Sequence, residues 1–222
     1  MLAKTKLYYK LLTDEIEIGE CLTQEKPEWF SKLPPFTDNR NGLFDKLVNA
    51  WRSAGFSDFT YTTAKMCDSF IDLFNNSYII TLPCDVMMQV ENDAVIWQTP
   101  NIDPMLDIRS HPSIQSGGAI KDTIVKFCLG VHLHSSKPTK GIYFPCDYHK
   151  EQPFKVLSGV TNYVPHKAIE LNVVTTMKDG VYEFKQGEPI AMLYFPDAVK
   201  LKKSNKEVAS VRKRFVKGYK NG

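Results

Sequence analysis

The chain has no long hydrophobic run. Its 222 residues contain no stretch of the ~18 consecutive apolar residues that a membrane-spanning helix requires. The first 30 residues also lack a basic region followed by an apolar region, which is the pattern of a secretory signal. We therefore expect synthesis in the cytoplasm of the cell that makes the protein and no membrane partner.

The cysteines are not clustered. The number of cysteines is odd, and no two of them are spaced as C-x-x-C. Structural zinc sites usually take closely spaced ligand pairs, and disulfide frameworks take even numbers of cysteines. We expect reduced, mostly buried thiols and no cofactor. The five are Cys21, Cys67, Cys84, Cys128 and Cys146.

Composition and length indicate one sizeable domain. Hydrophobic residues make up 43% of the chain and charged residues 24%, which is usual for a globular protein and excludes a disordered one. A chain of this length is typical of a single core. We predict one β-rich domain over 1–199, with a helical insert at about 43–75, and a basic tail or helix over 200–222.

Two segments have the spacing of short helices in the N-terminal part. Apolar residues share one helix face over 43–52, and again over Asp68 to Phe74, where the Asn75-Asn76 pair ends the pattern. No other convincing helix precedes residue 200. Asn101 to Gly118 combines proline, aspartate and glycine with weak periodicity, so it is predicted to be a long surface loop.

Most of the remaining chain has the pattern of β-strands. Short apolar or alternating segments are separated by turn residues such as Lys178-Asp179-Gly180. This pattern predicts a mainly β, antiparallel fold, either a sandwich or a closed barrel-like domain. The predicted strands are 7–12, 15–19, 78–82, 85–91, 94–98, 123–134, 141–144, 154–157, 168–175, 181–184 and 189–195.

The positive charge is concentrated at the C-terminus. Residues 200–222 hold nine basic residues and one acidic residue, a net charge of +8, which leaves −5 for residues 1–199. An acidic body with a basic tail indicates an anionic partner for the tail alone.

The tail has the pattern of an amphipathic helix. Ser204 and Glu207 form a capping box, and Val208, Val211 and Phe215 follow at helical spacing. So short a helix must dock to be stable. The docking partners that we consider for it are the chain's own acidic body, another protein chain, nucleic acid and a membrane surface. The candidate partner-binding residues are Arg212, Lys213, Arg214, Phe215 and Lys217.

Two histidines are candidate metal ligands. His132 and His134 stand at i and i+2, on one face of a predicted strand. A metal needs further ligands, and no carboxylate follows within the next few residues. We therefore predict strand-end histidines that face solvent or a partner, and no metal.

The segment 154–195 resembles the C-terminal half of the dUTPase and dCTP deaminase β-clip fold. Gly159-Val160 stands where that family has the hairpin that receives the pyrimidine, and Gly187 to Leu193 resembles its closing strand. The resemblance implies a candidate ligand hairpin and a homo-oligomer such as a trimer. The hairpin residues are Ser158, Gly159, Asn162 and Tyr163.

The catalytic residue of that family is missing from the hairpin. Asn162 occupies the position of the aspartate that activates water, and an amide cannot act as a general base. Tyr163 could lie under a base or could pack in the core. The motifs that bind the phosphates are also missing. We therefore predict no catalytic residue and no hydrolysis of dUTP.

A larger part of the chain resembles an uncharacterised tailed-phage family. The shared motifs are Pro27 to Pro34, Ala64 to Val86 and Phe154 to Phe195. The resemblance implies a phage protein without a known activity. We expect a non-enzymatic protein that acts through protein–protein surfaces, either as a virion component or as a factor bound to another protein. The alternative is a nucleotide-binding or nucleotide-hydrolysing protein derived from dUTPase.

Overall fold

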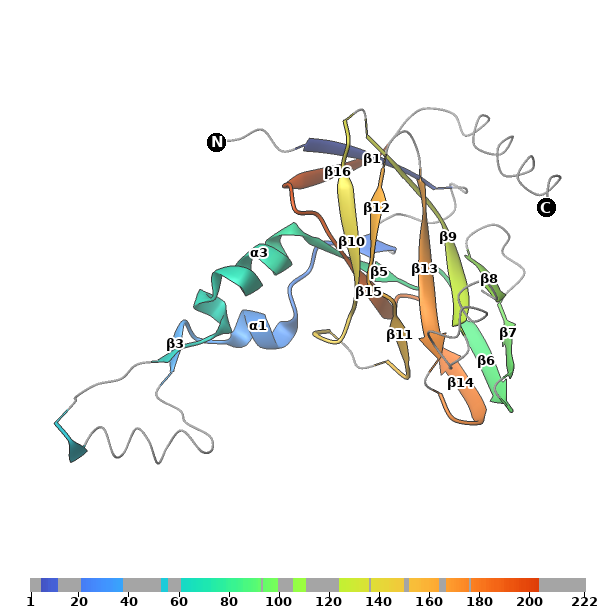
Figure 1. Cartoon of the computed structure of the whole chain (residues 1–222), viewed down its shortest axis with the longest axis horizontal. Coiled ribbons are helices and arrows are strands. Elements are labelled where there is room, and N and C mark those ends of the chain that lie inside the picture. Colours follow the sequence, from blue (N-terminus) through green and yellow to red (C-terminus); the bar gives the residue numbers. More distant parts are fainter. Residues whose placement is uncertain are drawn as a thin grey trace. The chain divides into compact units, whose positions relative to one another are not determined.

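The chain divides into two compact units. One consists of Met1–Gln24 and Asn76–Gly222, and the other is Glu25–Asn75. The structure is a computed structural model (Figure 1). It describes residues 5–11, 21–37, 53–55, 61–92, 94–99, 106–110, 124–135, 137–149, 152–163, 167–175 and 177–203.

A six-stranded sheet forms one layer of the larger unit. Its order is β11-β13-β9-β1-β16, and β8 also pairs with β9. Neighbouring strands are antiparallel except for the parallel pair β1 and β16. The strands are β1 (Thr5–Leu11), β8 (Leu106–Ser110), β9 (Ile124–His134), β11 (Phe154–Val156), β13 (Lys167–Thr175) and β16 (Val199–Lys203).

Two further antiparallel sheets complete this unit. The five-stranded sheet has the order β12-β10-β15-β5-β2, and the three-stranded sheet has the order β14-β6-β7. The first contains β2 (Leu22–Thr23), β5 (Ser77–Thr81), β10 (Lys140–Pro145), β12 (Gly159–Asn162) and β15 (Pro189–Tyr194). The second contains β6 (Val86–Glu91), β7 (Ala94–Gln98) and β14 (Gly180–Phe184).

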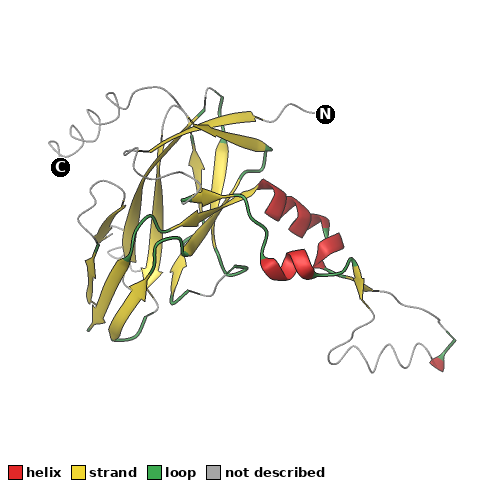
Figure 2. Cartoon of the chain, turned by 180° about the vertical axis from the view of Figure 1, so that it is seen from behind, coloured by secondary structure: helices red, strands yellow, loops and turns green. Residues whose placement is uncertain are grey.

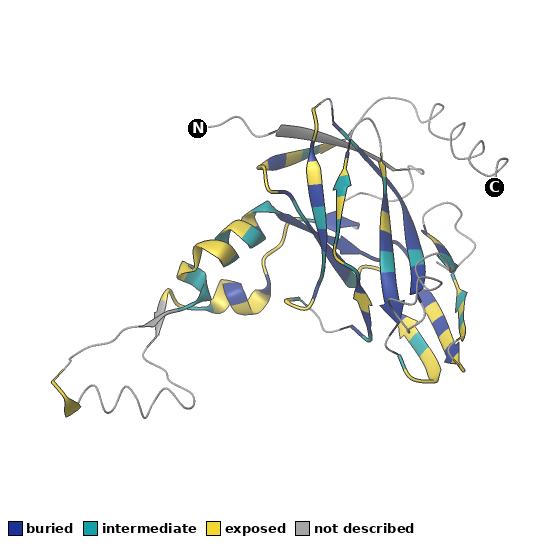
Figure 3. Ribbon diagram, in the orientation of Figure 1, coloured by how far each residue is buried: buried dark blue, intermediate teal, exposed yellow. Residues whose placement is uncertain are grey.

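One hydrophobic core joins the three sheets. It contains Leu129 and Val173 of the six-stranded sheet, Ile80 and Leu193 of the five-stranded sheet, and Met88 of β6. All five residues of β5 are buried, whereas β6 alternates buried and exposed positions along its length (Figure 3). The predicted mainly β fold is confirmed, but no sheet of the described strands closes into a barrel.

The smaller unit contains most of the helical structure among the described residues (Figure 2). Four aromatic side chains, Trp29, Phe30, Phe70 and Phe74, hold its helices together. The ring centroids of Phe30 and Phe74 are 4.7 Å apart, and Trp29 is edge-on to both. Lys65 donates to the Ser31 carbonyl at 2.8 Å. The elements are α1 (Glu28–Lys32), β3 (Phe36–Thr37), β4 (Tyr61–Thr62), the 3-10 helix η2 (Ala64–Met66) and α3 (Asp68–Asn76).

The helices differ in part from the sequence prediction. The helix predicted at 68–74 lies within α3, which continues to Asn76. The helix predicted at 43–52 lies outside the described residues. Helix α1 was not predicted, because Pro27 and Pro34 on either side of it are residues typical of loops. Pro27 is instead the residue that precedes the first helical turn, where its missing N–H costs nothing.

Two strands replace predicted irregular segments. Strand β8 lies within the predicted loop 101–118, where Leu106 and Ile108 are buried against β9. Strand β16 covers the start of the predicted tail, because Val199 to Lys203 pairs with β1. Both predictions were wrong at these positions. The pairing partners lie far away in the sequence, so a local pattern does not reveal them.

Candidate functional site

The candidate ligand hairpin is an edge strand of the five-stranded sheet. Gly159–Asn162 form β12, which pairs only with β10 among the described strands. Gly159 and Val160, which stand where the dUTPase family has its hairpin, therefore lie within a strand. Ser158, Val160 and Asn162 are exposed on the outer side of this edge.

Tyr163 follows β12 and is fully buried. Its backbone N–H donates to the Thr139 carbonyl at 2.9 Å, and its own carbonyl accepts from the Ser135 N–H at 2.9 Å. Its hydroxyl lies 2.5 Å from the Tyr143 hydroxyl, and its ring centroid is 6.0 Å from that of Phe195. Tyr163 is thus part of the core.

Burial sets the acidity of this tyrosine pair. It raises the pKa of Tyr143 to about 12, although the hydrogen bond from Tyr163 opposes this shift. It also raises the pKa of Tyr163 well above its ordinary value, and the neighbouring Tyr143 adds to that shift. Both hydroxyls therefore stay protonated at neutral pH and serve as a buried hydrogen-bonded pair.

The hairpin does not present a stacking surface for a base. Tyr163, the aromatic side chain considered for that role, has 0% of its surface exposed. Asn162 is exposed beside it and carries an amide, which cannot take up a proton at neutral pH. The four predicted residues are neighbours in the chain, but the Ser158 and Asn162 side chains are exposed whereas Tyr163 is in the core.

The two histidines occupy the end of β9. His132 is opposite Lys10 and Ala168, and His134 is opposite Tyr8. His132 is buried, which differs from the predicted position facing solvent or a partner, whereas His134 is half-buried. In the part of the chain that the structure describes, no three histidine, cysteine or acidic side chains are placed to hold a metal ion.

The cysteines have the predicted character. All five are free; Cys67 is exposed and the other four are buried. Burial raises the pKa of Cys128 to about 11, with a further contribution from Glu170, so this thiol is a poor nucleophile at neutral pH.

The candidate partner-binding residues from Arg212 to Lys217 lie outside the described part of the chain.

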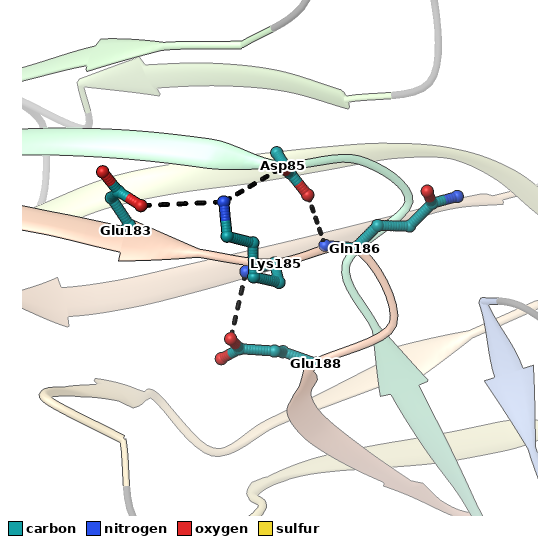
Figure 4. A network of polar contacts seen from close by, with 5 residues as sticks. All are labelled: Asp85, Glu183, Lys185, Gln186 and Glu188. Atoms are coloured by element: carbon teal, nitrogen blue, oxygen red, sulfur yellow. Dashed lines mark hydrogen bonds and ion pairs between the residues drawn. The ribbon is translucent and has the colours of Figure 1, made fainter.

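A polar network that the sequence analysis did not identify joins two turns (Figure 4). The Asp85 carboxylate accepts from the Gln186 N–H at 2.8 Å and from Lys185 Nζ at 3.2 Å. Glu188 accepts from the Lys185 N–H at 3.0 Å. The turn before β6 is thereby fixed to the turn before β15.

Backbone hydrogen bonds strengthen the same junction. The Gly187 N–H donates to the Leu82 carbonyl at 2.9 Å, and the Leu82 N–H donates to the Glu188 carbonyl at 2.9 Å. Gly187 has a φ of 82°, a conformation that favours glycine. Both segments stood out as motifs in the sequence, and the structure gives them a shared structural role.

We expect Asp85→Ala to lower the thermal midpoint more than Glu183→Ala does. Asp85 holds the backbone of a turn, whereas Glu183 makes only an exposed ion pair with Lys185 at 3.6 Å. The Gln186 N–H and then Lys185 lower the pKa of Asp85, so its stabilising effect is lost as the pH falls through that pKa. Thermal unfolding of both variants at pH 7 and at acidic pH tests this order, and equal midpoints would contradict it.

The three-stranded sheet has an apolar outer face, formed by Met87, Ile96 and Val181. These side chains are 42%, 63% and 61% exposed. Ile96 and Val181 both lie opposite Gln89 on β6, so Gln89 stands between them on the outer face, and Met87 lies in the next row, diagonal to both. Such an exposed apolar cluster is typical of an interaction surface.

The comparisons with known proteins give no family. No family model matches the chain, and none of the curated proteins matches it. Among the described residues there is no helix of the length and apolar character needed to cross a membrane.

Proposed function

We propose that this chain is a non-enzymatic phage protein that acts by binding protein chains, and that it is a component of the virion. The observation that carries this proposal is the apolar face of Met87, Ile96 and Val181. Exposed apolar side chains on one face of a sheet are costly to leave in water and favour a protein partner. The phage context comes from the sequence resemblance.

The positions of Tyr163 and Asn162 in the candidate ligand hairpin support this proposal over a nucleotide-hydrolysing enzyme. Tyr163 is held in the core by Tyr143 and Phe195, and Asn162 cannot act as a general base. A dUTPase-derived function would need a base-binding surface elsewhere. The β-clip relationship itself remains part of the proposal, as does a homo-oligomeric assembly.

Mass spectrometry of purified phage particles tests the proposal. We expect the chain at a level comparable to that of other structural proteins of the particle. A chain carrying Ile96→Glu should be lost from the particles, because the substitution places a charge in the apolar contact. Val160→Glu is the matched control, since Val160 is a 67% exposed aliphatic residue on a different sheet.

Two results would contradict the proposal. One is the absence of the chain from the particles. The other is Mg²⁺-dependent cleavage of dUTP by the purified chain, which would favour the nucleotide-hydrolysing alternative.

A further inference from the structure

The strands that form the apolar face carry acidic but no basic side chains, and the basic residues Lys178 and Lys185 flank β14 on either side. The outward positions beside Met87, Ile96 and Val181 include Glu91 and Glu183. Lys185 follows β14, but it is already shared between Glu183 and Asp85. Two such faces would repel each other, whereas a basic amphipathic segment would be complementary.

The chain itself carries a segment of that kind. Residues 204–222 have six basic residues and one acidic residue, and they place Val208, Val211 and Phe215 on one side of a helix. Seven residues separate Val208 from Phe215, which is ~10 Å along a helix. Ile96 and Val181 are two strand spacings apart, also ~10 Å, with Gln89 between them and Met87 in the adjacent row. The apolar stripe and the apolar face therefore match in length and in charge.

The register of the strands defines where the C-terminal segment begins. Lys203 is opposite Tyr9 of β1, and Tyr9 is opposite Leu133 near the end of β9. The C-terminal segment therefore starts two strands away from Leu133.

The three-stranded sheet is near the other end of β9. Phe184 of β14 packs on Phe154, with ring centroids 5.3 Å apart, and Phe154 is opposite Thr175. The preceding residue, Val174, is opposite Ile124 at the start of β9. Ile124 and Leu133 are nine residues apart, which is ~30 Å along a strand.

A helix that begins at the Ser204 capping box cannot span this separation within one chain. Phe215 is twelve residues beyond Lys203, which is ~18 Å along a helix. We propose that the C-terminal helix of one copy packs Val208, Val211 and Phe215 on the apolar face of a second copy. This inference rests on the proposed function, because it names the partner of the same surface.

The contact joins two different surfaces, so it is a head-to-tail contact. Such contacts give a closed ring when the rotation between copies closes, and an open chain of copies when it does not. Each copy then contributes one apolar face and one C-terminal helix.

Mixing two variants of the full chain tests the proposal. Ile96→Glu destroys the face and leaves the helix, whereas Phe215→Asp destroys the helix and leaves the face. We expect each variant to lose self-association, with an increase in Kd of about 30-fold or more. An equimolar mixture should form a 1:1 complex, because one intact face meets one intact helix.

Analytical ultracentrifugation at up to about 100 µM chain is the measurement, since a small interface binds weakly. Val160→Glu is the control and should associate like the unmodified chain. Circular dichroism checks that each variant is folded. A monomeric unmodified chain, or a mixture of folded variants that stays monomeric, would overturn the inference. If Ile96→Glu is still lost from phage particles in that case, the proposed function stands and only this choice of partner fails.

Discussion

We expect Gly141→Ala to destabilise the protein by about 2–3 kcal/mol, because this position of β10 has no room for a side chain. A Cβ atom there would lie 2.7 Å from the Tyr163 ring, 2.8 Å from Leu193 and 3.2 Å from Phe195. All three neighbours are completely buried, so none can move aside without disturbing the core. Chemical denaturation followed by circular dichroism measures the loss.

Gly159→Ala is the matched control for this prediction. Gly159 lies on the neighbouring strand β12, and a Cβ atom there would meet nothing within 4 Å. Its replacement should be neutral or stabilising by up to about 1 kcal/mol, since alanine restricts the unfolded chain. Equal effects of the two substitutions would show that Tyr163 does not pack against β10 as described.

The second prediction is a loss of stability in alkaline solution. A tyrosine in the unfolded chain loses its proton near pH 10, whereas burial raises the pKa of Tyr143 to about 12 in the folded protein. Above pH 10 the folded state therefore holds a proton that the unfolded state has released. The stability contributed by this group is complete below pH 10 and falls as the pH rises through about 12. The loss from Tyr143 alone is about 3 kcal/mol.

A double variant isolates this effect. Tyr143→Phe combined with Tyr163→Phe keeps the rings and removes both hydroxyls, so its stability should fall less steeply between pH 10 and 12. At pH 7 the double variant should be more stable than Tyr143→Phe alone, which leaves the Tyr163 hydroxyl buried without its partner. Denaturation curves at several pH values measure both effects. Parallel pH profiles for the double variant and the unmodified chain would contradict the assignment.

The pairing of the two tyrosines also explains why the candidate ligand hairpin, which was predicted from the resemblance, does not form a base-binding site. Local sequence placed Ser158, Gly159, Asn162 and Tyr163 together, and the structure keeps them adjacent. The direction of Tyr163 depended on Tyr143 and Phe195, which are 20 and 32 residues away. Hydrogen bonding and packing over such separations leave no local pattern, so the sequence left stacking and packing equally open.

The sequence alone determined the mainly β class, the helix beginning at Asp68 and the character of the cysteines. These properties follow from periodicity and composition, which are set by residues close together in the sequence. Along Val86–Glu91, for example, successive side chains are alternately buried and exposed, as expected for a strand. The tertiary structure decided the strand at Val199–Lys203, the partner of Asp85 and the placement of Ile96 and Val181 on either side of Gln89. Each of these three features depends on residues that are distant in the sequence. Only the pairing of strands in the folded chain brings those residues together.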